Sequence, residues 1–122
     1  MNLTRVLIVD DVEQVRLDLR TLLTLTGETE VIGEAANGSE AVSLTETLKP
    51  DVVLMDLEMP VLDGYAATQQ IKTRFPPCRV IALTVHDYEL ARTKAQQSGV
   101  DAFLVKGAPL ESIVKTISKR KE

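Results

Sequence analysis

Residues 52–56 read Val-Val-Leu-Met-Asp, four apolar residues followed at once by a carboxylate. Three other segments have the same form: residues 6–11 read Val-Leu-Ile-Val-Asp-Asp, residues 80–84 read Val-Ile-Ala-Leu-Thr, and residues 103–106 read Phe-Leu-Val-Lys. Short runs rich in valine, isoleucine and leucine are typical of strands that are buried on both faces. If these strands are parallel neighbours, their polar end residues meet at one edge of a sheet, where open α/β sheets bind their ligands.

Helical patterns separate these runs and complete an alternating order of elements. Apolar residues recur at helical spacing over residues 15–23, 41–48 and 110–117, and two more helices are expected over about 65–75 and from a cap at Asp87 to about residue 98. The more polar segment 30–35 predicts a weaker strand, which belongs at an edge of the sheet. Five strands that alternate with five helices predict an α/β fold of parallel strands with helices on both faces.

The composition indicates a globular domain and narrows the classes of function. Of the 122 residues, 44% are hydrophobic and 26% are charged, which is typical of one folded domain. The net charge is −4, from 14 basic and 18 acidic residues, which argues against nucleic-acid binding by the chain itself. No apolar stretch approaches the roughly 18 residues of a membrane span. The lone Cys78 fits a reducing compartment, so we expect a cytoplasmic protein without a membrane partner.

The polar strand ends bring together groups that suit phosphoryl chemistry. Three carboxylates, Asp10, Asp11 and Asp56, are costly neighbours unless a proton or cation relieves their repulsion. Oxygen ligands without histidine or cysteine favour a hard ion, and Mg²⁺ fits a site with few carboxylates. Thr84 adds a hydroxyl and Lys106 an ammonium, which suit in-line attack by a carboxylate on a phosphoryl group. Each aspartate alone is also a good turn residue, Thr84 an ordinary strand residue and Lys106 an ordinary surface lysine, but that reading explains the whole set poorly.

Together these segments resemble the receiver domain of bacterial two-component response regulators. The resemblance covers essentially the whole chain, residues 1–122, as a single domain. It rests on these segments: Val9-Asp10-Asp11, Met55-Asp56-Leu57-Glu58-Met59-Pro60, Asp63-Gly64, Leu83-Thr84 and Phe103-Leu104-Val105-Lys106. The resemblance implies a flavodoxin-like (CheY-like) α/β fold whose five-stranded parallel sheet has the order 2-1-3-4-5, with helices on both faces.

The resemblance implies a role for each polar strand end. Asp56 is expected to accept a phosphoryl group from the phosphohistidine of a sensor histidine kinase. Lys106 is expected to pair with Asp56 and later with the phosphoryl group. The expected protein ligands of Mg²⁺ are Asp10, Asp11, Asp56 and the backbone carbonyl of Glu58. Phosphoryl transfer and hydrolysis are then self-catalysed only, so the chain is not expected to be an enzyme.

A switch and two tuning positions are also implied. Thr84 is expected to move toward the phosphoryl group while Phe103, the switch aromatic, turns inward and changes the surface of the fourth helix, fifth strand and fifth helix. Phe103 can also be read as a plain core aromatic. Glu58 and His86, two residues after Asp56 and Thr84, are expected to border the path of the attacking water and to set the phosphoryl lifetime. A lone loop histidine is, however, as often only solvated.

The segment after Lys106 departs from many receivers, which have proline there, often after a cis bond. Here Gly107 follows and proline comes only at Pro109, so we expect a trans bond and a looser loop. The Lys-Gly-Ala-Pro ending and residues 84–87 resemble receivers of the NarL/LuxR type, which usually carry a C-terminal helix-turn-helix domain. We therefore expect residues from about 118 to 122 to begin a linker to an absent effector domain that binds DNA and controls transcription. A receiver homodimer on phosphorylation is a further expectation.

Other readings come from different classes of protein. They are a stand-alone receiver that acts by protein contacts, an aspartyl-phosphate phosphatase and a flavodoxin-like cofactor binder. The phosphatase pattern Asp-x-Asp-x-Thr is not met by Asp10-Asp11-Val12, and no cap domain is available. A flavin binder would lack a phosphate loop, and aromatic residues make up only 3% of the chain. The complete acidic, lysine and threonine set disfavours a degenerate receiver that signals without phosphate.

Overall fold

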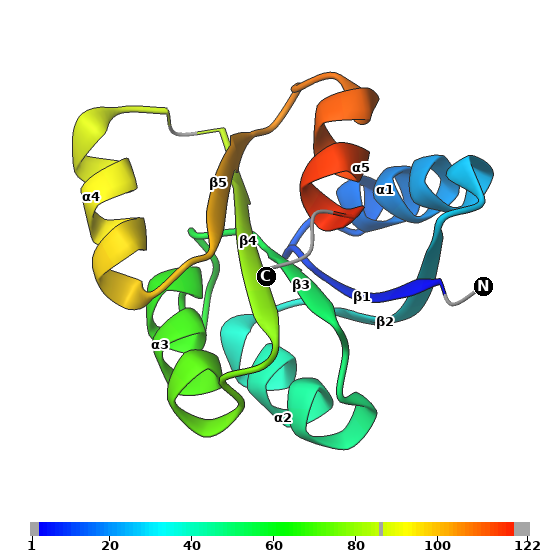
Figure 1. The fold of residues 1–122 in the computed structure, drawn as a ribbon. Coiled ribbons are helices and arrows are strands. Elements are labelled where there is room, and N and C mark those ends of the chain that lie inside the picture. The colour runs from blue at the N-terminus through cyan, green and yellow to red at the C-terminus, as the bar shows by residue number, and fades with distance from the viewer. Residues whose placement is uncertain (1–2, 86, 119–122) are drawn as a thin grey trace.

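A computed structural model describes residues 3–85 and 87–118 of the chain. Within these residues five strands alternate with five helices, and Figure 1 shows how they are arranged. The strands are β1 (Thr4–Val9), β2 (Thr29–Ala35), β3 (Val52–Met55), β4 (Arg79–Thr84) and β5 (Ala102–Val105). The helices are α1 (Glu13–Thr26), α2 (Gly38–Leu48), α3 (Gly64–Arg74), α4 (Glu89–Ser98) and α5 (Leu110–Ser118). The predicted alternation is confirmed, and each of the four apolar runs lies in a strand.

The strands form one parallel sheet in the order β2-β1-β3-β4-β5. This is the predicted CheY-like order, and the polar strand β2 lies at an edge as expected. Val9 pairs with Met55, and Met55 pairs with Ala82, so β1 and β3 end side by side. Thr84 pairs with Val105 at the ends of β4 and β5. The residues that follow these strands therefore share one edge of the sheet.

Alternate residues of the strands pack on opposite faces of the sheet, as expected of buried strands. Helices α1 and α5 cover one face, and α2, α3 and α4 cover the other (Figure 1). The first face is built mainly from Val6, Ile8, Leu54, Ile81, Leu19, Leu23, Ile113 and Ile117. The second is built mainly from Leu7, Val9, Val53, Val80, Ala41, Ala67 and Ile71. The central strands are buried on both sides, which fixes their positions at the functional edge.

The helix ends agree with the sequence signals at the end of α1 and at the end of α4, which is Ser98 as predicted, but not at the start of α4. Gly27 ends α1 in the left-handed conformation with a φ of 74°, where glycine carries no steric cost. The expectation that Asp87 caps α4 is wrong. Tyr88 holds the cap position without a side-chain hydrogen bond, and the carboxylate of Asp87 instead accepts from Arg92 Nε at 2.7 Å. None of the described helices has the length and apolar character needed to cross a membrane.

Candidate functional site

The first two acidic residues follow β1 in a turn that hydrogen bonds hold in place. Asp10 is 1% exposed, and its N–H donates to the carbonyl oxygen of Ala35 at 3.1 Å. Its Oδ1 accepts from the N–H of Val12 at 2.9 Å. Asp11 is exposed. The turn therefore presents one buried and one exposed carboxylate at the edge of the sheet.

Asp56 follows β3 and lies beside the end of β1. It is 7% exposed, and its N–H donates to the carbonyl oxygen of Val9 at 3.0 Å. Helix α3 begins directly against it, since the Gly64 N–H donates to the carbonyl oxygen of Leu57 at 2.9 Å. A Cβ atom at Gly64 would overlap the backbone carbonyl oxygen of Asp56. Only glycine allows the start of α3 to pack this closely against the backbone of Asp56, and this packing holds the loop that carries Asp56 in place.

Lys106 and Thr84 complete the edge from β5 and β4. The N–H of Lys106 donates to the carbonyl oxygen of Thr84 at 2.7 Å, and Thr84 is 1% exposed. Lys106 Nζ lies 2.6 Å from Asp10 Oδ2 and 3.6 Å from Asp56 Oδ2. The ammonium therefore contacts both buried carboxylates and is closer to Asp10 than to Asp56, the partner that the resemblance implies.

The three aspartates form one cluster of oxygen ligands. One carboxylate oxygen from each of Asp10, Asp11 and Asp56 lies within 4.8 Å of the others. Burial raises the pKa of the Asp56 carboxyl to about 6; the charge of Lys106 opposes this rise, and that of Asp10 adds to it. Three carboxylates and one ammonium leave excess negative charge, which a divalent cation would neutralise. Oxygen-only donors at this spacing fit Mg²⁺.

Phe103 lies between the sheet and α4 and is neither fully buried nor fully exposed. It packs against the cluster of Leu57, Ala82 and Ala95. The guanidinium carbon of Arg92 lies 4.5 Å from the centre of its ring, within the range of a cation–π contact. The aromatic ring is thus held by α4 on its outer side.

Two loop expectations have different outcomes. The peptide bond between Lys106 and Gly107 is trans, as expected, and Gly107 has a φ of 94°, which favours glycine. Glu58 is exposed next to Asp56. His86 lies outside the described residues, so its expected place beside the water path stays a prediction.

One residue of the site was missed from the sequence. Arg16, on α1, donates from Nη1 to the backbone carbonyl oxygen of Asp10 at 2.7 Å. The available signal was a pair of arginines, Arg16 and Arg20, four residues apart and on one helix face, together with Glu34 in the polar strand. That signal identifies an ion-pair network only once α1 is placed against β2.

Comparisons with known proteins point to one family. A family model described as "Response regulator receiver domain" matches residues 6–118. Response regulator protein VraR of Staphylococcus aureus (strain NCTC 8325 / PS 47) is 40% identical over 117 residues, which are 94% of this chain and 55% of that protein. The chain therefore spans about half the length of the curated relatives it matches.

Solved structures agree in fold. A DNA-binding response regulator of the LuxR family from Staphylococcus aureus superposes with a TM-score of 0.88 at 31% identity, over 94% of this chain and 96% of that one. The response regulator domain of Thermotoga maritima CheB gives a TM-score of 0.88 at 30% identity, over 95% of this chain and 94% of that one.

Proposed function

Because this chain belongs to the response regulator receiver family, we propose that it is a phosphorylation-activated switch with Asp56 as the phosphoryl acceptor. The observation that carries the proposal is the cluster of Asp10, Asp11 and Asp56, with oxygens within 4.8 Å of one another and with Lys106 in contact. Family membership implies a histidine kinase partner. The donor is then the phosphohistidine of that kinase.

The proposed transfer is a direct displacement on phosphorus. An oxygen of Asp56 forms a bond to phosphorus while the bond from phosphorus to the imidazole nitrogen breaks, and the leaving nitrogen keeps the electron pair and takes a proton. Asp10, Asp11, Asp56 and the backbone carbonyl of Glu58 would hold Mg²⁺. Bound there, Mg²⁺ supplies neutralisation of charge on the phosphoryl oxygens. Later attack of water on the phosphoryl group returns Asp56 and inorganic phosphate.

Before transfer the Lys106 ammonium contacts two carboxylates, those of Asp10 and Asp56. Its ammonium lies nearer Asp10, at 2.6 Å, than Asp56, at 3.6 Å. This leaves the Asp56 oxygens less tightly paired, which favours their attack. After transfer the phosphoryl group carries about two negative charges, so the ammonium would then turn to it.

The switch would run through Thr84 and Phe103. Thr84 lies at the same sheet edge as Asp56, and movement of its hydroxyl toward a phosphoryl oxygen would open space for Phe103 to turn inward. Arg92 covers the Phe103 ring, so inward rotation would break that contact and alter the surface of α4. The changed surface of α4, β5 and α5 is the proposed output.

The proposed output controls transcription through a DNA-binding domain beyond the receiver. Support comes from the likeness to a LuxR-family protein described as DNA-binding and from relatives about twice as long as this chain. Residues from about 118 to 122 would begin the linker, and phosphorylated receivers would pair as a homodimer. This chain alone should give no gel shift with DNA. Tight DNA binding by this chain would contradict the proposal that a separate domain binds DNA.

The central test is incubation with acetyl phosphate and Mg²⁺, followed by intact mass. We expect the mass of one phosphoryl group on the parent, none on Asp56→Ala, and none when EDTA removes the metal. Asp18→Ala, which changes an exposed aspartate of α1, serves as the control and should be modified like the parent. An adduct that persists in Asp56→Ala would overturn the assignment.

The proposed tuning residues are tested by the lifetime of the adduct. Glu58→Ala and His86→Ala should each change the rate at which the phosphoryl group is lost, because the two side chains would border the attacking water. The rate is followed by intact mass after the donor is removed. Rates equal to that of the parent would remove these residues from the proposal.

A further inference from the structure

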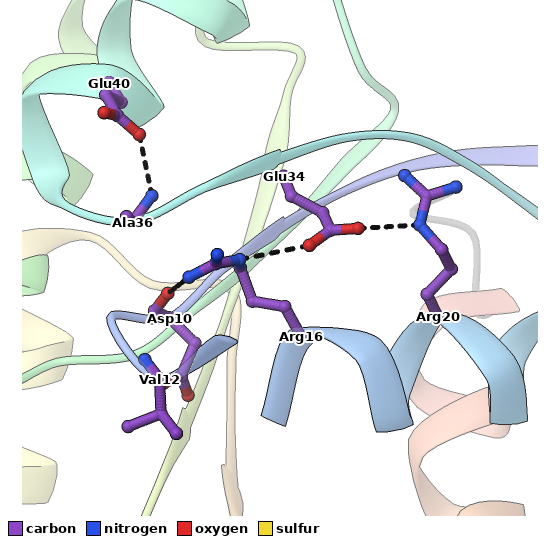
Figure 2. A network of polar contacts seen from close by, with 7 residues as sticks. All are labelled: Asp10, Val12, Arg16, Arg20, Glu34, Ala36 and Glu40. Carbon is purple, nitrogen blue, oxygen red and sulfur yellow. Dashed lines mark hydrogen bonds and ion pairs between the residues drawn. The ribbon is translucent and has the colours of Figure 1, made fainter. Parts of the chain in front are cut away.

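Arg16 joins the acidic turn to the edge of the sheet. Figure 2 shows its guanidinium between the backbone of Asp10 and the carboxylate of Glu34. Nη1 donates to the Asp10 carbonyl oxygen at 2.7 Å, and Nε donates to Glu34 Oε1 at 3.0 Å. The Arg16 side chain is only 15% exposed. Such a two-ended, largely buried contact differs from an ordinary surface ion pair, which is worth little.

Glu34 holds Arg16 in this position. Its second oxygen, Oε2, accepts from Arg20 Nε at 2.7 Å, so the carboxylate lies between two guanidinium groups (Figure 2). Its side chain is 22% exposed. The result is a short network from Arg20 on α1, through Glu34 on β2, to Arg16 and the turn after β1.

Other hydrogen bonds already restrain Asp10 itself. Ala35 accepts from its N–H at 3.1 Å, Val12 donates to Oδ1 at 2.9 Å, and Lys106 Nζ lies 2.6 Å from Oδ2. The carbonyl oxygen is the remaining polar group, and it belongs to the peptide that connects Asp10 to Asp11. Because that peptide is planar, fixing its oxygen also fixes the direction in which the chain leaves for Asp11.

We propose, resting on the function proposed above, that Arg16 is a positioning residue that sets the placement of the two β1-end carboxylates for the divalent cation. Its contact orients the Asp10–Asp11 peptide, while Glu34, which it shares with Arg20, offsets part of its charge. An unbalanced guanidinium so near the cluster would repel the cation, so the bond to Glu34 and the bond to Asp10 act together. Residues that orient metal ligands in this way typically change metal affinity by about 10–100-fold when they are replaced.

The test measures Mg²⁺ affinity separately from stability. Arg16→Lys keeps the charge but cannot bridge Asp10 and Glu34 with two fixed N–H groups. We expect this substitution to raise the Mg²⁺ dissociation constant about tenfold. Glu34→Gln removes the carboxylate charge that faces Arg16, so it should also raise the Mg²⁺ dissociation constant. Titration of the metal alone, followed by NMR of the folded protein, gives this constant, and urea unfolding gives the stability of each variant.

Arg20→Ala is the matched control. It removes another arginine from Glu34 without touching Asp10, so its Mg²⁺ constant should stay within about twofold of the parent even if its stability falls. The inference is overturned if folded Arg16→Lys binds Mg²⁺ like the parent, or if Arg20→Ala weakens binding as much as Arg16→Lys does. A parent that neither binds Mg²⁺ nor accepts a phosphoryl group overturns the proposed function, and this inference with it.

Discussion

Replacing Asp56 with asparagine should stabilise the metal-free protein at pH 8. Asp56 is 7% exposed and shares its cluster with Asp10 and Asp11. Burial raises its pKa to about 6 despite the nearby charge of Lys106. The ionised carboxylate is therefore less favourable in the folded chain than in the unfolded one. Asparagine has nearly the same shape without the charge, so it removes this cost.

The sign and size follow from proton linkage. Between an unfolded pKa of 3.8 and a folded pKa of about 6, the folded state binds more protons at Asp56 than the unfolded state. Stability contributed by this residue is therefore present at low pH and is lost as the pH rises through that window. At about 1.4 kcal/mol per pKa unit the loss is at most about 3 kcal/mol. Screening by solvent reduces it, so we expect Asp56→Asn to gain about 1–3 kcal/mol.

The assay is urea unfolding followed by circular dichroism in EDTA, with parent and variant compared at pH 4 and pH 8. The gain should be present at pH 8 and small at pH 4. Glu46→Gln is the control, since Glu46 is 60% exposed in its pair with Arg74, and it should change stability by less than about 0.5 kcal/mol. Added Mg²⁺ should stabilise the parent more than the variant, because only a species that binds gains from the ligand.

An Asp56→Asn variant no more stable than the parent at pH 8 in EDTA, with Glu46→Gln behaving as expected, would show that the ionised Asp56 carboxylate does not destabilise the fold. That result would mean that the fold relieves the charge of Asp56 fully through Lys106 and solvent. A gain of the same size at both pH values would also contradict the prediction, because the effect would then not depend on ionisation.

Three further predictions follow from single residues. Gly64→Ala should destabilise the fold by about 3 kcal/mol in urea unfolding, because its Cβ would overlap the Asp56 carbonyl oxygen; Gly107→Ala, which meets open space but has a positive φ, should cost only about 1 kcal/mol. Lys106→Gln should move the pH dependence of acetyl phosphate reaction to higher pH, because the lysine charge lowers the pKa of Asp56; an unchanged pH profile by intact mass would contradict this. Burial raises the pKa of the Cys78 thiol to about 11, so it should resist a thiol reagent at pH 8 until urea unfolds the protein, and fast labelling of the native chain would count against that burial.

The strands and most of the candidate site could be predicted because each depends on local sequence. A run such as 52–55 is apolar at every position, so it can lie only in the interior, and the polar residue after it marks the sheet edge. The strand order came from the resemblance to a family, since apolar periodicity does not say which strands are neighbours. The structure confirms the order through the pairing of Val9 with Met55 and Met55 with Ala82.

Features that depend on side-chain geometry could not be predicted from the local sequence. The position of Lys106 after a buried strand places its ammonium at the site, but the sequence does not show which carboxylate it pairs with more closely. In the structure Nζ lies 2.6 Å from Asp10 Oδ2 and 3.6 Å from Asp56 Oδ2. Asp87 has the residue type of a helix cap, yet its carboxylate pairs with Arg92 instead. A charged partner on the next turn competes with the backbone N–H groups for the same oxygen, and the sequence does not say which interaction is stronger.

The acidic cluster and the Arg16 network are physically linked, because the network restrains the turn that carries two of the mutually repelling carboxylates. Three carboxylates within 4.8 Å repel one another, and the exposed member, Asp11, lies in a turn that could relax by swinging outward. The hydrogen bonds from Val12 and Arg16 restrain that turn at Asp10. A site that must attract a divalent cation cannot simply relieve its own repulsion, because the same repulsion drives cation binding. It needs restraint with little added positive charge, and a guanidinium whose charge is partly offset by Glu34 supplies it.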